Sequence, residues 1–114
     1  MNETYFNTLI EGWIKHCKQP EVEFSSSGIP VRENCYYREL AKGGKEILPY
    51  VRSLYDLNNR NFAFEIIKAH GLPSLVKDIV GEDLVIPTEI HGHVSSIENY
   101  VKNWLDLNLD KYKK

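Results

Sequence analysis

The sequence has little excess charge of either sign and no long run of basic residues. Its 14 lysines and arginines are nearly balanced by 16 aspartates and glutamates, which leaves a net charge of -2 over 114 residues. A nucleic-acid-binding surface needs clustered basic residues, and no basic run of five or more occurs. A mimic of nucleic acid needs a dense acidic face, which this net charge does not supply. We therefore expect no nucleic-acid partner.

Long apolar runs are also missing, and we expect no secretory leader. No apolar stretch approaches the roughly 20 residues that a membrane-spanning helix requires. The first residues, Met-Asn-Glu-Thr, supply neither the basic nor the apolar segment of a signal peptide. We expect a cytoplasmic protein without membrane association.

Cysteine is scarce, with Cys17 and Cys35 as the only two. Both lie in expected helices among apolar neighbours, which favours two buried, reduced thiols. A disulfide or a reactive thiol is the alternative. His16 adjoins Cys17, but successive side chains on a helix point about 100° apart, so this adjacency argues against a catalytic pair.

Familiar catalytic and cofactor motifs are absent. The sequence has no Gly-rich phosphate loop, no H-E-x-x-H and no C-x-x-C. Glu33 and Glu39 do not share a helix face, so paired carboxylates for acid–base catalysis are not indicated. We expect no cofactor and no enzymatic activity. The alternative is a small metal-binding or hydrolytic protein in which His91 and His93 act with nearby acids of residues 82–89.

Helical periodicity dominates what is present. Apolar residues recur every three or four positions, and glycines, prolines and capping residues bound these stretches. The pattern predicts helices over residues 2–18, 31–42, 45–57, 60–70 and 74–80, with a last helix from Ser95. Gly43 and Gly44 are predicted to end the second helix, and Gly71 and Pro73 the fourth. We expect one all-α domain over residues 1–114, a compact bundle of five to six helices.

Two segments interrupt this periodicity. Residues 19–30 are rich in serine, glycine and proline, which predicts a loop. Residues 82–92 contain a short β-branched stretch that ends in Pro87. A lid, a β-arm and a disordered segment all remain open for residues 82–94. Ser95 and Glu98 fit a capping box at the start of the last helix.

Aromatic residues are plentiful, with seven tyrosines and two tryptophans. Trp13, Trp104 and Phe62 fall on apolar stripes, so we expect them in the core. Tyr50 and Tyr55 are predicted to flank the core stripe rather than to lie in it. Tyrosine and arginine are enriched at protein interfaces. We therefore expect a partner-binding surface made of Tyr36, Tyr37, Arg38, Tyr50 and Tyr55.

Two short motifs, Gly44-x-x-Ile47-Leu48-Pro49-x-Val51-x-x-Leu54 and Phe62-x-x-x-Ile66-x-x-x-His70-Gly71, together resemble the helix pair of HEAT-like repeats. Most of the chain is also similar to a group of small uncharacterised bacterial helical proteins. That similarity is carried by Trp13, Ser25-Ser26, Tyr37, the step from Gly44 to Pro49, and Trp104-Leu105. HEAT-like folds are mostly binding surfaces, so the resemblance implies antiparallel helix pairs and a protein partner.

These features predict a non-enzymatic protein-binding module, such as an immunity protein, an antitoxin or an inhibitor that occludes one partner protein. The metal-binding or hydrolytic protein that uses His91 and His93 is the second hypothesis. The third is a subunit that self-associates through an exposed helix face, which would make the protein a homodimer.

Overall fold

Helices make up most of the chain that the structure describes. The computed structural model describes residues 1–20, 33–57, 62–90 and 92–112, and no strand occurs among them. In chain order these residues form α1 (Glu3–Cys17), α4 (Cys35–Lys42), η1 (Gly44–Ile47), α5 (Leu48–Leu54), α6 (Phe62–Ile66), η2 (Ile67–Gly71), α7 (Leu72–Val80), η3 (Gly81–Asp83), η4 (Thr88–Ile90) and α8 (Val94–Tyr112). The radius of gyration of 13.4 Å is that of a compact chain of this length. The prediction of a compact all-α fold is confirmed for these residues.

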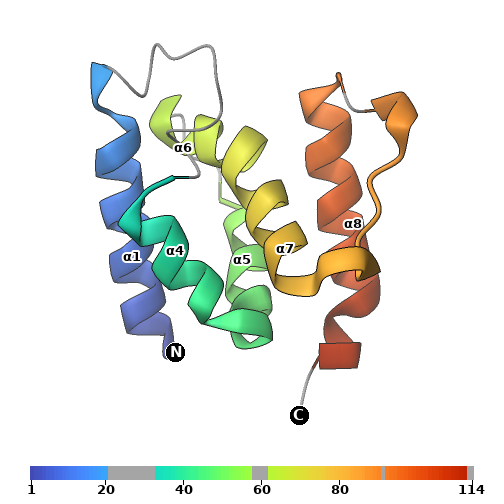
Figure 1. Cartoon of the computed structure of the whole chain (residues 1–114), viewed down its shortest axis with the longest axis horizontal. Coiled ribbons are helices and arrows are strands. Elements are labelled where there is room, and N and C mark those ends of the chain that lie inside the picture. Colours follow the sequence, from blue (N-terminus) through green and yellow to red (C-terminus); the bar gives the residue numbers. More distant parts are fainter. Residues whose placement is uncertain (21–32, 58–61, 91, 113–114) are drawn as a thin grey trace.

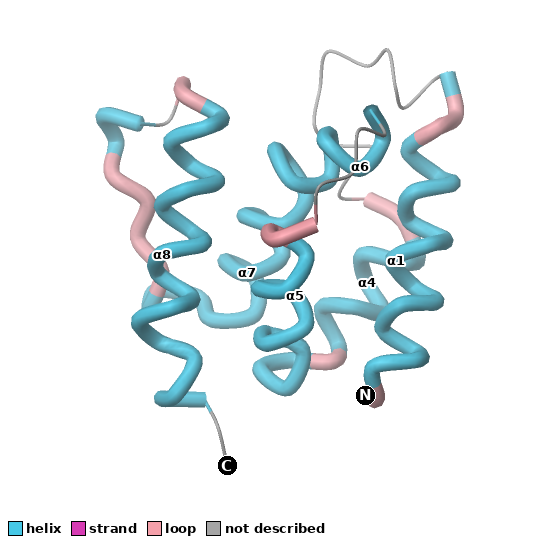
Figure 2. Tube along the Cα trace, turned by 180° about the vertical axis from the view of Figure 1, so that it is seen from behind, coloured by secondary structure: helices cyan, strands magenta, loops and turns pink. Residues whose placement is uncertain are grey.

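The helices that follow one another along the chain run in alternating directions. In Figure 1, α1 rises from the N-terminus, α4 descends beside it, α5 rises behind, and α6 and α7 descend again. Helix α8 packs against α5 and α7 and closes the other side of the molecule. Seen from behind in Figure 2, α5 lies between α1 and α8. Helix α5 therefore has one side toward each of these two long helices.

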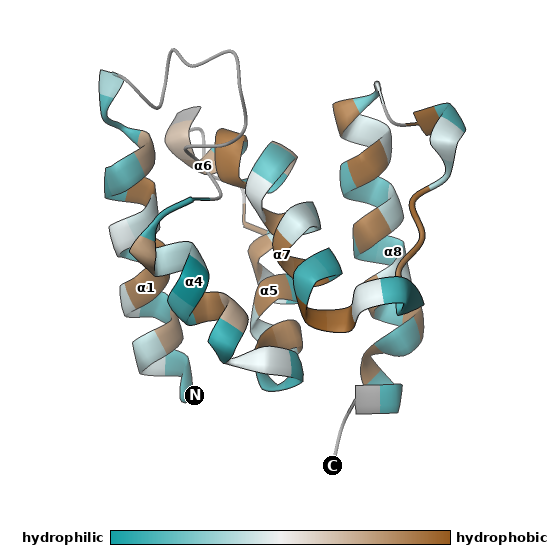
Figure 3. Ribbon diagram, in the orientation of Figure 1, coloured by the Kyte–Doolittle hydropathy of each residue, from teal (hydrophilic) through white to brown (hydrophobic). Residues whose placement is uncertain are grey.

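Helix α1 follows the predicted range of residues 2–18 closely. Asn2 caps it, because its side-chain oxygen accepts a hydrogen bond of 2.8 Å from the backbone N–H of Tyr5. Glu3 lies in the first turn, where the helix dipole favours a negative charge. The stripe of apolar residues spaced by three and four is buried, and Figure 3 shows apolar and hydrophilic residues alternating along α1 and α8.

Helix α4 ends where the sequence predicts and begins later. Its first residue is Cys35, and the buried Asn34 caps it by accepting a 2.9 Å hydrogen bond from the N–H of Tyr37. Residues 31 and 32 of the predicted helix lie outside the described residues. After Lys42 the chain reaches Gly44, whose φ of 65° is a left-handed conformation that favours glycine.

The prediction of a single helix over residues 45–57 is wrong, because the α-helix in this range covers fewer residues. The chain first forms the 3₁₀ turn η1, in which Leu48 N–H donates to the carbonyl of Lys45, and α5 starts just before Pro49. Proline has no N–H to donate to an earlier turn, so it fits only the first turn of a helix. Beyond Leu54 the bonds shorten again to i→i−3 spacing, ending with Leu57 N–H on the carbonyl of Leu54 at 3.2 Å.

The predicted stop at Gly71 and Pro73 is also wrong. A π-helical turn, η2, joins α6 to α7, and Leu72 N–H donates to the carbonyl of Ile67, five residues earlier. The wider turn carries the chain past Pro73 in helical form although proline cannot donate a backbone bond. Continuing the helix keeps Leu72 and Leu75 fully buried. Of the predicted helix over 60–70, residues 60 and 61 lie outside the described residues.

Residues 81–90 pack along α8. They comprise the 3₁₀ turns η3 and η4 and an extended segment, residues 84–87, between them. Leu84 is fully buried, and its carbonyl accepts a 2.5 Å bond from the Lys77 ammonium. The hydroxyl of Tyr100 donates to the carbonyl of Val85 at 2.7 Å. Helix α8 then begins at Val94, one residue before the predicted Ser95. The break in helical rhythm is confirmed, and the described part of this segment forms no β-strand.

Every α-helix contributes to one core. Its buried residues are Phe6, Leu9, Ile10, Trp13, Cys17, Tyr37, Leu40, Ile47, Leu48, Val51, Leu54, Tyr55, Ala63, Phe64, Ile67, Leu72, Leu75, Val76, Val80, Leu84, Val101 and Leu105. The prediction for Trp13 is confirmed, whereas Trp104 is half-buried and packs at the edge of the core. The side chain of Phe62 lies outside the described residues. Among the described helices, none has both the length and the apolar character that a membrane crossing needs.

Candidate functional site

The five residues predicted to bind a partner do not form one surface. Tyr37 is only 6% exposed, so it belongs to the core. Its ring meets Trp13 edge-on with centroids 5.6 Å apart, and its hydroxyl donates to the Asp78 carboxylate and lies 3.0 Å from the Ser74 hydroxyl. Tyr37 thus joins α4 to α1 and α7 instead of facing solvent.

Tyr55 is also a core residue, and the prediction that it flanks the core is wrong. It follows the last residue of α5 and is 9% exposed. Its buried hydroxyl has no hydrogen-bond partner within the residues that the structure describes. Burial raises the pKa of Tyr55 far above its usual range, and the nearby Glu98 carboxylate raises it further. An unpaired buried hydroxyl costs stability and offers no surface to a protein partner.

Tyr36 and Arg38 lie on α4 but differ in exposure. Arg38 is exposed, whereas Tyr36 is half-buried against α1. The ring of Tyr36 lies so close to Gly12 that a Cβ at Gly12 would sit 2.2 Å from the ring carbon Cε1. This close approach, which glycine permits, makes Tyr36 a packing residue between α1 and α4.

Tyr50 is half-buried and packs on Phe6 of α1, whereas Tyr36 packs on Gly12 of the same helix. Its ring is tilted by 40° on the ring of Phe6, with centroids 5.3 Å apart. Beside this ring pair is a pocket of about 170 Å³ between α1 and α5, which we call the α1–α5 pocket. Its lining residues are Glu3, Phe6 and Asn7 of α1, Tyr50, Ser53 and Leu54 of α5, and Leu57 just beyond α5.

The α1–α5 pocket has an apolar interior and a polar rim. Phe6 and Leu54 are buried and form its inner wall. Leu57 forms part of the outer wall and is 51% exposed, so its apolar surface is open to solvent. The exposed lining residues are otherwise polar: Glu3, Asn7 and Ser53. An apolar floor with a polar rim is the arrangement found where proteins bind an apolar group from solution.

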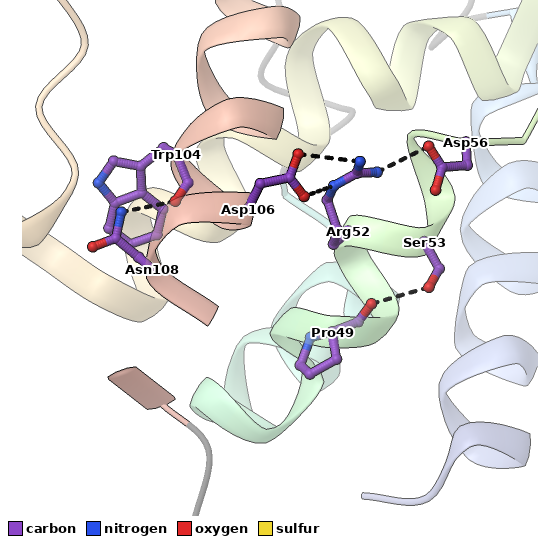
Figure 4. Close-up of polar contacts among 7 residues, drawn as sticks. All are labelled: Pro49, Arg52, Ser53, Asp56, Trp104, Asp106 and Asn108. Atoms are coloured by element: carbon purple, nitrogen blue, oxygen red, sulfur yellow. Dashed lines mark hydrogen bonds and ion pairs between the residues drawn. The ribbon is translucent and has the colours of Figure 1, made fainter. Parts of the chain in front are cut away.

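The opposite side of α5 is closed by ion pairs, as Figure 4 shows. Arg52 donates to both carboxylate oxygens of Asp106 on α8, through Nε at 2.5 Å and Nη2 at 3.3 Å, and through Nη1 to Asp56 at 3.0 Å. This pairing lowers the pKa of Asp106 and raises that of Arg52. Ser53, the next residue, donates instead to the carbonyl of Pro49 at 3.1 Å and lies on the α1 side of the helix.

The two cysteines differ from each other. Cys17 is buried, and burial raises the pKa of its thiol to about 11, so it stays protonated and unreactive at neutral pH. Cys35 is exposed at the start of α4, so the prediction that both thiols are buried is wrong for Cys35. Both are free thiols.

The histidine hypothesis receives no geometric support from the described residues. His91 lies outside them, and His93 is exposed just before α8. Within residues 1–20, 33–57, 62–90 and 92–112, no group of three His, Cys, Asp or Glu side chains is placed to hold a metal ion.

No protein-family model, curated protein or solved structure matches the chain. Its function therefore has to be argued from its own residues.

Of the residues that line the α1–α5 pocket, the sequence predicts only Tyr50 as part of a binding surface. Glu3 fits the first turn of a helix, and Leu57 falls at the end of the helix predicted over residues 45–57. The exposure of Leu57 depends on α5 ending at Leu54, which the periodicity did not indicate. Asn7 and Ser53 carry no signal of their own, because the pocket exists only where α1 and α5 meet.

Proposed function

We propose that this protein is a non-enzymatic protein-binding module, of the kind found in immunity proteins, antitoxins and inhibitors that occlude one partner. The observation that carries the proposal is the α1–α5 pocket, an apolar recess with a polar rim beside a half-exposed leucine. Interfaces concentrate their binding energy in such recesses, where one anchor side chain is buried and surrounding contacts exclude water.

The size of the pocket favours a protein partner over a small-molecule ligand. Pockets for drug-sized ligands and cofactors measure roughly 300–1,000 Å³. The α1–α5 pocket, at about 170 Å³, is smaller than this range. It is close to the ~150 Å³ cavity that accommodates one benzene molecule. It suits one side chain of a larger molecule that makes its other contacts on the surrounding surface.

We further propose that the helices pack as HEAT-like antiparallel pairs and that the protein is related to the small bacterial helical proteins which it resembles. The alternating directions of α1, α4, α5 and α6–α7 support this arrangement. We place the protein in the cytoplasm, where an exposed free thiol such as Cys35 stays reduced.

The test is a tagged pull-down from a lysate of the organism that carries the gene, read by mass spectrometry. The variants are Leu57→Asp, in the pocket wall, and Leu107→Asp, on the outside of α8. Both leucines are exposed, at 51% and 83%, so both variants are expected to fold. We expect one near-stoichiometric partner with the wild type and with Leu107→Asp, and its loss with Leu57→Asp.

Alanine variants of Tyr36 and Tyr50 are less suitable than Leu57→Asp for testing partner capture. Their rings pack on Gly12 and Phe6, so truncation would disturb the fold and confuse lost binding with lost stability. A partner that Leu57→Asp still captures contradicts the proposed site. A chain that captures no protein and forms dimers by light scattering would instead be a self-associating subunit.

A further inference from the structure

We propose that the α1–α5 pocket receives one aromatic or branched aliphatic side chain of a partner protein, from a segment that also brings a lysine or arginine to Glu3. The inference rests on the proposed function and adds the chemistry of the segment that is recognised. It follows from the volume and the buried apolar lining of the pocket, from the charge at its rim and from the polar groups around it.

The inner wall selects an apolar group. Phe6 and Leu54 are buried, and Phe6 is held in place by the tilted ring of Tyr50 at 5.3 Å. A group that enters contacts aromatic and aliphatic surface and displaces water from it, which is favourable in proportion to the apolar area covered. A benzene-sized group fills a cavity of this volume, so phenylalanine, leucine and similar side chains fit.

The rim selects a positive charge beside that group. Glu3 is exposed, and its carboxylate makes no ion pair or hydrogen bond to any other residue that the structure describes. It therefore differs from Asp106 and Asp56, which both form an ion pair with Arg52. A free carboxylate at the edge of an apolar recess complements a basic residue next to the anchor and repels an acidic one.

The remaining rim groups suit a peptide backbone. The Ser53 hydroxyl uses its proton on the Pro49 carbonyl at 3.1 Å, so its free lone pair is an acceptor for a backbone N–H. The amide of Asn7 is exposed on the other wall and both donates and accepts. Together they provide polar partners for the main chain on either side of the anchor residue.

The experiment uses a display library of random short peptides selected on the immobilised full chain. We expect the enriched peptides to share an aromatic or branched aliphatic residue next to a lysine or arginine. The tightest peptide, made synthetically, then supplies a Kd for each variant. Leu57→Asp should weaken it by at least about tenfold, and Glu3→Lys by about fivefold, the upper end for one exposed ion pair.

Two matched variants and one altered peptide serve as controls. Leu107→Asp places the same charge on another exposed leucine, and Glu11→Lys makes the same reversal on α1 outside the pocket lining. Both should leave the Kd unchanged. Replacing the basic residue of the peptide by glutamate should weaken binding to the wild type and restore binding to Glu3→Lys.

The proposal is overturned if no peptide is enriched, if the enriched peptides lack the apolar and basic pair, or if Leu57→Asp binds as the wild type does. Peptides whose binding is lost with Leu107→Asp would move the site to α8 and leave the binding-module function standing. If the chain binds neither a peptide nor a protein from the lysate, both the anchor chemistry and the proposed function fail.

Discussion

The two sides of α5 differ in their contacts, although both belong to the same helix. Toward α8, the guanidinium of Arg52 holds Asp106 and Asp56, and the side chain of Arg52 is only 17% exposed. Toward α1, the neighbouring Ser53 lines the α1–α5 pocket together with Glu3, whose carboxylate has no ion pair among the residues that the structure describes. One side therefore fastens two helices together, and the other leaves apolar surface available.

We propose that this difference separates stability from binding within a single seven-residue helix. The ion pair links α5 to α8 without covering the side of α5 that faces α1. A pocket whose walls keep their position when it is empty binds at a lower entropic cost.

The largest expected effect comes from the inner wall of the pocket. Phe6 is 1% exposed and belongs to both the pocket and the core. We expect Phe6→Ala to lower the free energy of unfolding by about 3–5 kcal/mol, because a large buried side chain is replaced by a cavity. Urea denaturation at equilibrium measures this. A loss below about 1 kcal/mol would show that Phe6 is not core.

The next largest effect on stability is the difference between Tyr→Phe substitutions at two buried tyrosines, Tyr37 and Tyr55. Tyr37→Phe removes a hydroxyl that bonds Asp78 and Ser74, and we expect a loss of about 1 kcal/mol. Tyr55→Phe removes a hydroxyl at the end of α5 that has no hydrogen-bond partner among the described residues, so we expect no loss or a gain. Thermal denaturation of both variants gives the comparison. A clear loss in Tyr55→Phe would reveal a partner for that hydroxyl.

A smaller effect depends on pH and tests the α8 side of α5. Because Arg52 lowers the pKa of Asp106 in the folded chain, the pair stabilises the fold above the usual aspartate pKa. This contribution is lost as the pH falls through the lowered folded value. Asp106→Asn should therefore be less stable than the wild type at neutral pH, and the difference should close in acid.

The control for this profile is Glu11→Gln, which removes an exposed carboxylate that has no ion pair or hydrogen bond within the described residues. Its urea midpoint should follow that of the wild type at every pH. A constant difference between Asp106→Asn and the wild type down to strong acid would mean that the pair contributes nothing.

The smallest effect on stability is expected at the outer wall of the pocket. Leu57 is 51% exposed, so Leu57→Ala should change the free energy of unfolding by no more than about 0.5 kcal/mol. The same is expected of Leu107→Ala on α8. If Leu57→Ala alone lowered the free energy of unfolding several times more than this, Leu57 would be a core residue and could not form the outer wall of the proposed site.

The sequence predicted the helices well where an element's own periodicity decides the outcome. Helix α1 follows its expected range because cap, dipole and apolar stripe agree. The expectation failed at Pro73, where a local rule predicted a stop. There the burial of Leu72 and Leu75 and a π-helical turn carry the helix through the proline.

The binding surface was harder to predict because exposure depends on neighbours distant in sequence. Tyr36 and Tyr37 are adjacent on one helix, yet one covers Gly12 and the other enters the core. The α1–α5 pocket joins residues near the N-terminus to residues of the middle of the chain. The residue spacing within either segment does not predict that these residues come together in the fold.

The most direct test of the account is methyl NMR of the leucines during titration with the selected peptide. Leu54 and Leu57 report on the α1 side of α5, and Leu105 and Leu107 report on α8. We predict that the methyl signals of Leu54 and Leu57 shift progressively with added peptide, while those of Leu105 and Leu107 stay in place. Shifts confined to Leu105 and Leu107 would contradict the claim that the open side of α5 is the binding site.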